Sequence, residues 1–295
     1  MAKLKQYVGI IGGSGLYAIE GFKLKKRMSV KTPFGKPSGP LMVGTLGGVD
    51  VIFLARHGEG HVLNPSEVNY RANIWALKKA GVVGIFSVSA VGSLKEDIKP
   101  GHMVVIDQFF DRTKGRHSTF FEKGIVAHVG FAKPVSGYMR NILIESCKAV
   151  GATVHERGTY VCMEGPMFSS LAESQFYRTL RGDVIGMTNL QEAKLAREAE
   201  IDYATLALAT DYDCWHPHHD SVTTEQILAV MQANIATAQK IVTEAAKRFD
   251  PQGPLETPGI AGRAIFTDRK KIKPAVVKRL QPIIGKYFNN EDKNI

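Results

Sequence analysis

The chain has 295 residues, of which 44% are hydrophobic and 22% are charged. This length can bury a large core and this composition is typical of globular proteins, so a disordered or fibrous chain is excluded. The formal net charge is +10, and +6 of it comes from residues 269–295, where eight Lys or Arg accompany two acids. A basic end of this kind is usually solvated, and no nucleic-acid-binding motif accompanies it. We therefore expect small-molecule partners and not nucleic acid.

The chain shows no sign of a targeting or membrane segment. Its first apolar run ends at Gly12, too early for the core of a signal peptide, and no later stretch has the length of a membrane-spanning helix. We therefore expect a cytoplasmic protein without a membrane partner. Its cysteines, Cys147, Cys162 and Cys214, are widely spaced and form no CxxC pair, so they predict neither a disulfide framework nor a zinc site.

Apolar runs and amphipathic stretches alternate along most of the chain. The predicted strands are short, rich in Val and Ile and mostly bounded by Gly or Asp; they span 7–11, 41–46, 49–55, 83–89, 103–106, 159–163, 184–187 and 203–209. The predicted helices span 67–80, 138–150, 169–180, 190–200 and 223–247. Several strands are continuously apolar, as in a sheet that is covered on both faces. The pattern predicts an α/β fold.

A boundary is predicted near residues 250–258. The periodic pattern is interrupted there by Pro251, Gly253, Pro254, Pro258 and Gly259. We expect residues 1–250 to form the main domain and residues 251–295 to be a basic C-terminal extension rather than a second domain.

Five of the predicted strands are followed by residues that can hold a ligand. These segments are 12–15, 56–58, 89–93, 188–189 and 210–213, and they contain hydroxyls, one Arg, one His and two carboxylates. In α/β sheets, ligands bind outside the carboxyl ends of the strands. The recurrence in five segments therefore favours one shared site.

The first three segments are typical of an oxyanion site. Glycines allow backbone N–H groups to approach a phosphate, and the Ser14 hydroxyl can donate to its oxygens. Arg56 can supply a bidentate clamp, and His57 can donate a further hydrogen bond. Each segment alone has a plainer interpretation: the glycine turn as an ordinary turn, the Arg-His pair as surface residues, and Ser89 as a small core residue.

Several sharper motifs are excluded. Leu16 stands where a nucleophile elbow needs its last glycine, Ala18 stands where a dinucleotide fingerprint needs its third, and no P-loop Lys is present. Glycines between His57 and His61 oppose the helix that would align them on a metal. The cluster His216, His218, His219 and Asp220 is interpreted as a solvated or substrate-covering loop, so no metal is expected.

At this point a family resemblance emerges. The segments that carry it are 9–15, 56–58, 69–77, 164–170, 187–188 and 209–215, which include Asn69-Tyr70-Arg71-Ala72-Asn73 and Glu164-Gly165-Pro166-Met167-Phe168-Ser169-Ser170. From about Tyr7 to Arg248 the chain resembles the methylthioadenosine phosphorylases within the trimeric purine nucleoside phosphorylase family. The resemblance implies a nucleoside phosphorylase domain over residues 1–250, with a phosphorylase/hydrolase-like α/β fold in which helices flank a central mixed sheet. It also implies a homotrimer without metal or organic cofactor, with inorganic phosphate as co-substrate.

The same resemblance implies roles for individual residues. Phosphate would be held by Ser14, Arg56, His57, Ser89, Ala90 and Thr188. Phe168 would pack near base and ribose, Met187 would contact the ribose, and Ser169, Asp211 and Asp213 would face the purine. His128 is similar to a residue that a neighbouring subunit contributes near the 5' position.

The two carboxylates also suit the base chemically. Breaking the glycosidic bond makes the purine anionic, and an acid near N7 would neutralise that charge. Asp211 is the candidate acid, with a pKa raised by burial and by Asp213. A carboxyl pair can accept from the 6-amino group of adenine and, when protonated, donate to N7, whereas a 6-oxo group would be repelled by an ionised carboxylate. This contrast favours 6-aminopurines.

Specificity at the 5' end is expected from the last predicted helix. Ile227 and Leu228 suit an apolar methylthio group, while Thr224 leaves room for adenosine, with its 5'-hydroxyl, as a second substrate. The segment after Pro258 departs from the family pattern. Alternatives to methylthioadenosine phosphorolysis are phosphorolysis of adenosine, inosine or guanosine, and hydrolysis by water in place of phosphate.

Overall fold

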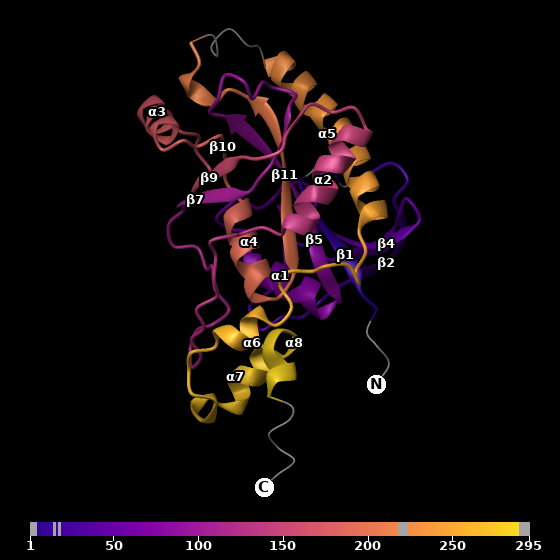
Figure 1. Cartoon of the computed structure of the whole chain (residues 1–295), viewed down its shortest axis with the longest axis vertical. Coiled ribbons are helices and arrows are strands. Elements are labelled where there is room, and N and C mark those ends of the chain that lie inside the picture. The colour runs from indigo at the N-terminus through magenta and orange to yellow at the C-terminus, as the bar shows by residue number, and fades with distance from the viewer. Residues whose placement is uncertain (1–4, 14–15, 17–18, 218–223, 289–295) are drawn as a thin grey trace.

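The computed structural model describes residues 5–13, 16, 19–217 and 224–288, with only the backbone of 224–228. Its described strands form one eleven-stranded mixed sheet (Figure 1). The strands are β1 (Tyr7–Gly12), β2 (Lys23–Met28), β3 (Leu41–Leu46), β4 (Val49–Ala55), β5 (Val82–Ser93), β6 (Met103–Val105), β7 (Gln108–Arg112), β8 (Val154–His155), β9 (Thr159–Met163), β10 (Val184–Gly186) and β11 (Asp202–Asp211). The order along the sheet is β2-β3-β4-β1-β5-β10-β9-β7, while β11 pairs with β5 and β6, and β6 pairs with β8. The predicted α/β fold with a central mixed sheet is confirmed.

Helices cover both faces of this sheet. They are α1 (Tyr70–Lys79), α2 (Gly137–Ala149), α3 (Leu171–Thr179), α4 (Asn189–Glu198), α5 (Thr224–Arg248), α6 (Ile260–Ala264), α7 (Pro274–Arg279) and α8 (Gln281–Ile284). Successive strand residues point to opposite faces. In β1, for example, Ile10 packs in the core under α2 and α5, while Ile11 packs in the core under α1 and α4. Burial on both faces explains the continuously apolar strands.

Capping residues set several helix starts. Asn69 accepts the Ala72 N–H at the start of α1, so the helix begins three residues later than the predicted residue 67. At α3, Ser170 and Glu173 form a capping box. The side chains of these residues replace the backbone acceptors that the first turn of a helix lacks.

The strands and helices that the sequence did not predict are short or polar. β2 has the sequence KLKKRM, is largely exposed and pairs antiparallel with β3 at the edge of the sheet. It carries no apolar alternation by which a strand could be recognised. β7 and β8 are likewise short or exposed, and α6, α7 and α8 lie in the C-terminal segment.

The C-terminal segment packs on the main domain through residue 288 (Figure 1). Side chains of this segment that join the core under α1 are Ala261, Ile272, Val276, Leu280, Ile283 and Ile284. The indole N–H of Trp75 in α1 donates to Arg279 O at 3.2 Å. Asp202 at the start of β11 accepts from the Thr257 N–H at 2.9 Å and from its hydroxyl at 2.6 Å. Residues on both sides of residue 250 thus share one core. The division into a main domain and an extension stays a prediction.

Glu200 anchors the same segment. Its carboxylate accepts from Lys286, from the Tyr287 hydroxyl and from the Ala261 N–H. Burial raises the pKa of Glu200, but the hydrogen bonds from Lys286 and Tyr287 outweigh it, so the pKa lies below its usual value. Removal of the residues after Pro258 is therefore expected to destabilise the protein.

We expect Leu280→Ala to lower the free energy of unfolding by at least about 2 kcal/mol, because the side chain is fully buried and its loss leaves a cavity. Urea unfolding would measure this loss. Lys278→Ala, at an exposed position in α7, is the matched control and should change little. Equal stability of the two variants would contradict the shared core.

No helix among the described residues combines the length and the apolar character that crossing a membrane requires.

Candidate functional site

Four strands that carry candidate residues run side by side. β4, β1, β5 and β11 pair in parallel, so their carboxyl ends meet at one edge of the sheet. Just beyond β4, the Arg56 N–H donates to Gly12 O at the end of β1 at 3.0 Å. At the end of β11, Asp211 pairs with Gly92 of β5. The structure thus brings these strand ends together, as the sequence predicts.

β10 departs from this arrangement. It pairs antiparallel with β5, with Ile185 opposite Gly92, and parallel with β9. Its end therefore lies alongside β5. The Tyr160 hydroxyl lies 3.2 Å from Ser89 Oγ and also meets the backbone of Thr188. The prediction that all five segments follow corresponding strand ends is wrong for β10, because the sheet is mixed, yet Thr188 still comes close to Ser89.

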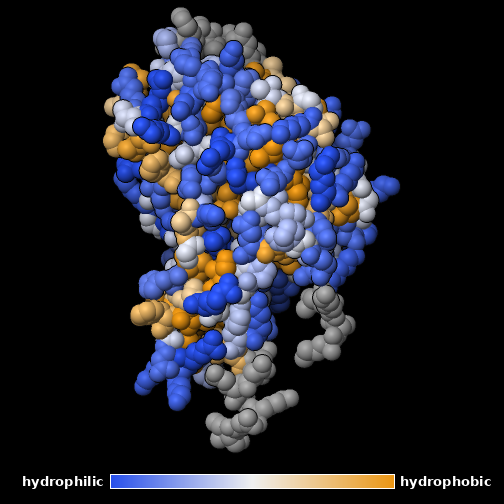
Figure 2. Space-filling model, viewed as in Figure 1, coloured by the Kyte–Doolittle hydropathy of each residue, from blue (hydrophilic) through white to orange (hydrophobic). Residues whose placement is uncertain are grey.

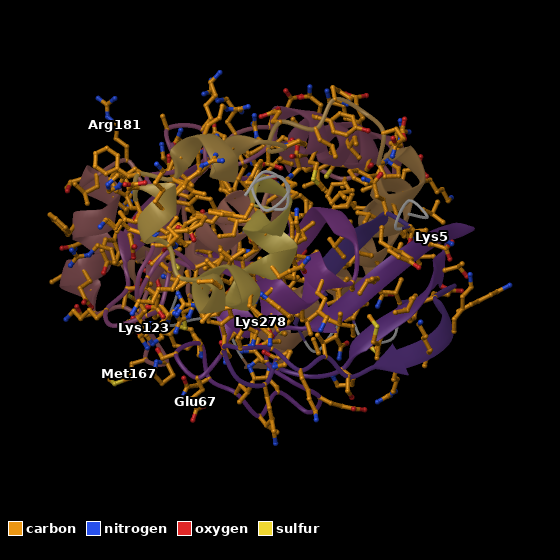
Figure 3. The ribbon with its side chains drawn as sticks, turned by 90° about the horizontal axis from the view of Figure 1, so that it is seen from below. Lys5, Glu67, Lys123, Met167, Arg181 and Lys278 are labelled. Atoms are coloured by element: carbon orange, nitrogen blue, oxygen red, sulfur yellow. The ribbon has the colours of Figure 1, made fainter. Side chains whose placement is uncertain are left out.

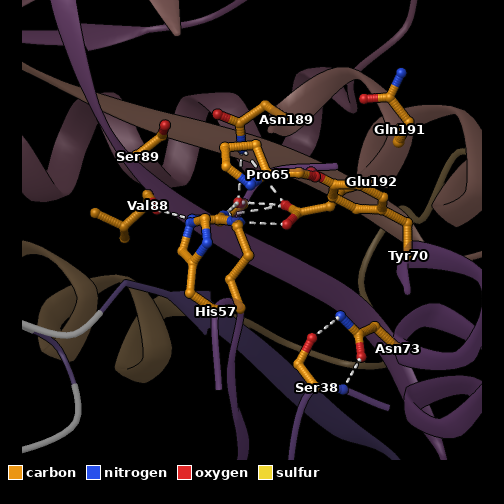
Figure 4. Close-up of polar contacts among 12 residues, drawn as sticks. Ser38, His57, Pro65, Tyr70, Asn73, Val88, Ser89, Asn189, Gln191 and Glu192 are labelled. Atoms are coloured by element: carbon orange, nitrogen blue, oxygen red, sulfur yellow. Dashed lines mark hydrogen bonds and ion pairs between the residues drawn. The ribbon is translucent and has the colours of Figure 1, made fainter. Parts of the chain in front are cut away.

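Arg56 lies at the centre of a buried polar network. Figure 4 shows residues of this network, among them Val88, Asn189 and Glu192. Its Nε donates to Glu192 Oε1 at 2.5 Å and its Nη2 to Glu192 Oε2 at 3.2 Å. Nη2 also donates to Ser87 Oγ at 2.6 Å, and Nη1 donates to Val88 O at 2.9 Å. Both charged side chains are 2% exposed.

Further hydrogen bonds among residues of β5, α4 and β11 complete the network. The hydroxyls of Ser87 and Tyr203 donate to Glu192 Oε2 at 2.7 and 2.9 Å. Asn189 Nδ2 donates to both hydroxyl oxygens at 2.8 Å. Each hydroxyl thus gives its proton to the carboxylate and accepts from the amide. The orientation of the carboxylate, and with it that of Arg56, is fixed by β5, α4 and β11 together.

These bonds change the role that the sequence assigned to Arg56. They use four of the five N–H groups of the guanidinium and leave one, on Nη1. A bidentate phosphate clamp needs two free N–H groups, so that expectation is wrong, and Arg56 can offer a ligand a single donor. Burial lowers the pKa of Arg56, but the Glu192 carboxylate reverses this and raises it, so the side chain stays charged.

His57 is held in one tautomer. It is 8% exposed and stacks on the His61 ring at 4.3 Å. Burial and then the charge of Arg56 lower its pKa to about 4, so the ring is neutral at pH 7. Its Nδ1 lies 2.8 Å from Leu63 O, and because a carbonyl oxygen only accepts, Nδ1 carries the proton. Nε2 is therefore an acceptor, and the expected hydrogen-bond donation by His57 is wrong.

The two aspartates form a second polar group near the carboxyl end of β5. Asp211 Oδ1 accepts from the Asp213 N–H at 2.8 Å and Oδ2 accepts from the Thr210 hydroxyl at 2.7 Å. Asp213 is 7% exposed, and Ser174 Oγ donates to its Oδ2 at 2.5 Å. Burial, reinforced by the charge of Asp211, raises the pKa of Asp213 above its usual value. The pair can therefore hold a proton more readily than two separate carboxylates.

A glycine allows this approach to β5. A Cβ on Gly92 would lie 3.0 Å from Asp211 Oδ1 and 3.2 Å from Asp213 Cβ. From Val88, which meets Arg56, to Gly92 the strand advances four residues, or about 13 Å. The guanidinium and the carboxylates are thus separate groups along one strand.

Three predicted contact residues lie on the segments beside these groups. Ser169 O accepts from Cys214 Sγ at 3.3 Å, which places Ser169 next to the aspartates. Met187 packs on Gly165, where a Cβ would lie 2.5 Å from its sulfur. Phe168 is 84% exposed, so most of its ring faces solvent. Figure 2 shows apolar side chains among polar ones at the edge where α3 lies; those exposed near its start are Met167, Phe168 and Leu171.

The structure describes only some of the remaining predicted residues in full. His128 is exposed beside α6: its ring lies 5.6 Å from Phe266, and its N–H donates to Ala264 O. Its role across a subunit boundary stays a prediction. Ser14 lies outside the described residues. Thr224, Ile227 and Leu228 begin α5 in the part where side chains are not described. Ala90 lies in β5, opposite Leu208 of β11.

Among the described residues, no group of His, Cys, Asp and Glu side chains could hold a metal ion. Of the cluster considered from the sequence, His218, His219 and Asp220 fall outside the described residues, and only His216 falls inside. The expected absence of a metal stays a prediction.

Comparison with known proteins identifies the class. The model of the phosphorylase superfamily matches residues 7–247, so the chain belongs to this superfamily. Within it, the chain is 51% identical to the S-methyl-5'-thioadenosine phosphorylase of Geobacter sulfurreducens over 285 residues, which are 96% of this chain and 100% of the relative. It is 53% identical to the protein of the same name from Chloroflexus aurantiacus over 283 residues, 96% of this chain and 98% of that one.

Solved structures of methylthioadenosine phosphorylases are also similar to this chain. The crystal structure of a methylthioadenosine phosphorylase from an antarctic soil metagenomic library has a TM-score of 0.91 and 45% identity, covering 95% of this chain and 99% of that one. An adenosine/methylthioadenosine phosphorylase variant from Schistosoma mansoni in complex with adenine has a TM-score of 0.84 and 35% identity, covering 89% and 100%. Because 96% of this chain aligns with the Geobacter protein, most of the segment after Pro258 has a counterpart there. The expectation that this segment departs from the family is wrong.

Proposed function

We propose that the chain catalyses phosphorolysis of S-methyl-5'-thioadenosine, giving adenine and 5-methylthioribose 1-phosphate, a pentosyl transfer in purine and methionine salvage. The observation that carries this proposal is the pair of polar groups on one strand: the Arg56 network beside Ser89 and Thr188, and the two aspartates about 13 Å further along. The Arg56 network suits an anion, and the two aspartates suit a purine. The substrate is supported by the names of the relatives.

The phosphate end is assigned from donors and acceptors. Arg56 offers one N–H, and Ser89 and Thr188, which are 6% and 4% exposed, lie close to Tyr160 and carry hydroxyls that can donate. Ser14 and the backbone of Ala90 are proposed as further donors. The neutral His57 offers an acceptor at Nε2, which suits the hydroxyl of monohydrogen phosphate.

The proton balance of the reaction supports this assignment. A phosphate oxygen forms the bond to C1', and the C1'–N9 bond breaks with its electron pair passing to adenine. The phosphate loses its one proton and adenine gains one. We propose that His57 Nε2 takes the first proton and that the Asp211–Asp213 pair, in which the pKa of Asp213 is raised, supplies the second. Met187 and Phe168 are proposed to cover ribose and base, and Ser169 to contact the purine edge.

The assignment of His57 predicts a selectivity among anions. Sulfate carries no proton at neutral pH and would set an oxygen lone pair against Nε2, whereas arsenate carries one proton, as phosphate does. We expect sulfate to compete with phosphate at least about tenfold more weakly than arsenate does. In His57→Gln the amide can turn an N–H towards the anion, so the difference in inhibition between sulfate and arsenate should become smaller. Inhibition constants of both anions in both proteins test it; an unchanged ratio would contradict the acceptor role.

The function itself is tested by adenine release. Methylthioadenosine, adenosine and inosine are each supplied with and without phosphate, in the presence of EDTA. We expect phosphate-dependent release, fastest from methylthioadenosine and much slower from inosine. Adenosine is the second candidate substrate, because the Schistosoma mansoni protein is named for both. Cleavage without phosphate would show a hydrolase, and loss of activity with EDTA would show a metal requirement.

Assembly and location are also proposed. We expect a cytoplasmic homotrimer in which His128 and the 5' residues Thr224, Ile227 and Leu228 of two copies meet at each site. The exposed Phe168 ring agrees with a site that is closed by substrate or a second copy. A solution mass three times that of the 32.3 kDa chain would support this.

A further inference from the structure

Arg116 is a buried arginine that the reaction scheme above does not use. It lies in a segment without helix or strand between β7 and α2, yet its side chain is only 3% exposed. A buried guanidinium is costly unless its N–H groups are all bonded. The partners of Arg116 therefore show what keeps it there.

Besides long contacts of 3.4 Å to the hydroxyls of Ser66 and Tyr70, the hydrogen bonds of Arg116 go to two segments of the candidate site. Nη1 donates to Met187 O at 2.5 Å and to Gln191 Oε1 at 3.3 Å. Nη2 donates to Glu164 O, and Nε donates to Glu164 Oε1 at 3.1 Å. One planar group thus joins the segment before Thr188 to the segment before Phe168 and Ser169. A lysine ammonium lacks this rigid planar arrangement of donors and could not bond both segments in the same way.

The same two segments touch each other directly. Met187 Sδ would lie 2.5 Å from a Cβ on residue 165, so the contact exists because that residue is Gly165. With the Met187 side chain packed on Gly165 and both carbonyls bonded to one guanidinium, the separation of the two segments is fixed at two points.

We propose that Arg116 is a positioning residue for phosphorolysis: it holds the Met187–Thr188 segment and the Glu164–Ser169 segment in register, so that the ribose and phosphate contacts stay aligned with those to the base. It need not touch the substrate. This inference rests on the proposed function of the site. A displacement of about 1 Å at a reacting centre costs on the order of 100-fold in rate, which sets the expected scale.

A cavity beside Arg116 makes the idea testable. It has a volume of 410 Å³ and is lined by Arg116 together with Ser66, Glu67, Arg71, Lys114 and Glu164, among others. Glu67 projects outward from the same edge of the molecule as Met167 (Figure 3). A small planar cation from solvent can therefore reach the place that the guanidinium leaves when Arg116 is truncated.

The experiment is chemical rescue of Arg116→Ala. The variant is assayed at a temperature at which circular dichroism shows it fully folded. We expect kcat to fall on the order of 100-fold and KM for phosphate to rise, because Thr188 follows Met187 directly. Millimolar guanidinium chloride should restore activity in a saturable way, while sodium chloride at the same ionic strength should not. Arg116→Lys should stay impaired, since it keeps the charge and loses the fork.

Arg71→Ala is the matched control. Arg71 lines the same cavity and pairs with Glu122 at 2.6 Å, but bonds to neither segment. It should keep most of its activity and show no response to guanidinium. The proposal is overturned if Arg116→Ala is as active as the native protein, if guanidinium does not rescue it, or if Arg116→Lys is fully active. Failure of the proposed function is separate: the native protein would then release no adenine with phosphate.

Discussion

Glu192→Gln is expected to lower the free energy of unfolding by about 3–5 kcal/mol in phosphate-free buffer, which is the usual cost of removing one partner from a buried ion pair. The amide is the same size as the carboxylate, so packing is kept. Its N–H group, however, would face the N–H groups of Arg56, which already donate to both carboxylate oxygens. The charge of Arg56 would remain buried without compensation.

Phosphate should reverse part of this loss. A bound dianion beside Arg56 would supply the charge that the variant lacks, so phosphate should raise the melting temperature of Glu192→Gln more than that of the native protein. Glu198→Gln, on the same helix, is the control. Burial raises the pKa of Glu198 to about 7, so this carboxyl is already about half protonated at neutral pH and should tolerate the amide. Equal effects of phosphate on all three proteins would place the anion away from Arg56.

The sequence predicted the parts of the fold that leave a periodic signal. Strands buried on both faces, such as β4 and β11, appear as apolar runs, and α5 appears through its helical spacing. β2 gives no such signal, because an exposed edge strand of mostly Lys and Arg has the composition of a loop. The direction of β10 was likewise hidden, since three residues carry no information about which neighbour they pair with.

The candidate site shows the same division. Residues at strand ends, such as Arg56 and Asp211, could be predicted because parallel strands bring their ends together. Glu192 could not be predicted, because its choice as the partner of Arg56 depends on where α4 packs. One signal was present: an arginine directly after a buried strand requires an acid nearby, but the chain has 28 acids to choose from.

The packing of the C-terminal segment was not predicted for a related reason. The charge of this segment suggested a solvated appendage, but in and beside α7 Lys278 is exposed while Val276 and Leu280 point into the core. Net charge describes the surface of a segment and says nothing of its buried face. A helix of six residues is too short for that face to stand out in the sequence.

Asp211→Asn is expected to lower kcat/KM for methylthioadenosine by about 100-fold or more, the usual cost of losing a group that transfers a proton in the transition state. Asp211 and Asp213 are coupled through the Asp213 N–H and through charge. The amide keeps an oxygen for the Asp213 N–H, so the backbone turn should survive. The amide cannot give a proton to N7. The negative charge of residue 211, which raises the pKa of Asp213 in the native protein, is also lost.

The substitution should also change which base is preferred. An amide N–H can donate to the 6-oxo group of hypoxanthine, which an ionised carboxylate repels, so the ratio of inosine to methylthioadenosine turnover should rise even though both rates are low. Initial rates with both nucleosides measure this ratio. Asp213→Asn tests the neighbour, whose Oδ2 accepts from Ser174. If Asp211→Asn slowed both nucleosides equally, the carboxylate would serve catalysis without reading the base, and selection of adenine would have to come from elsewhere in the site.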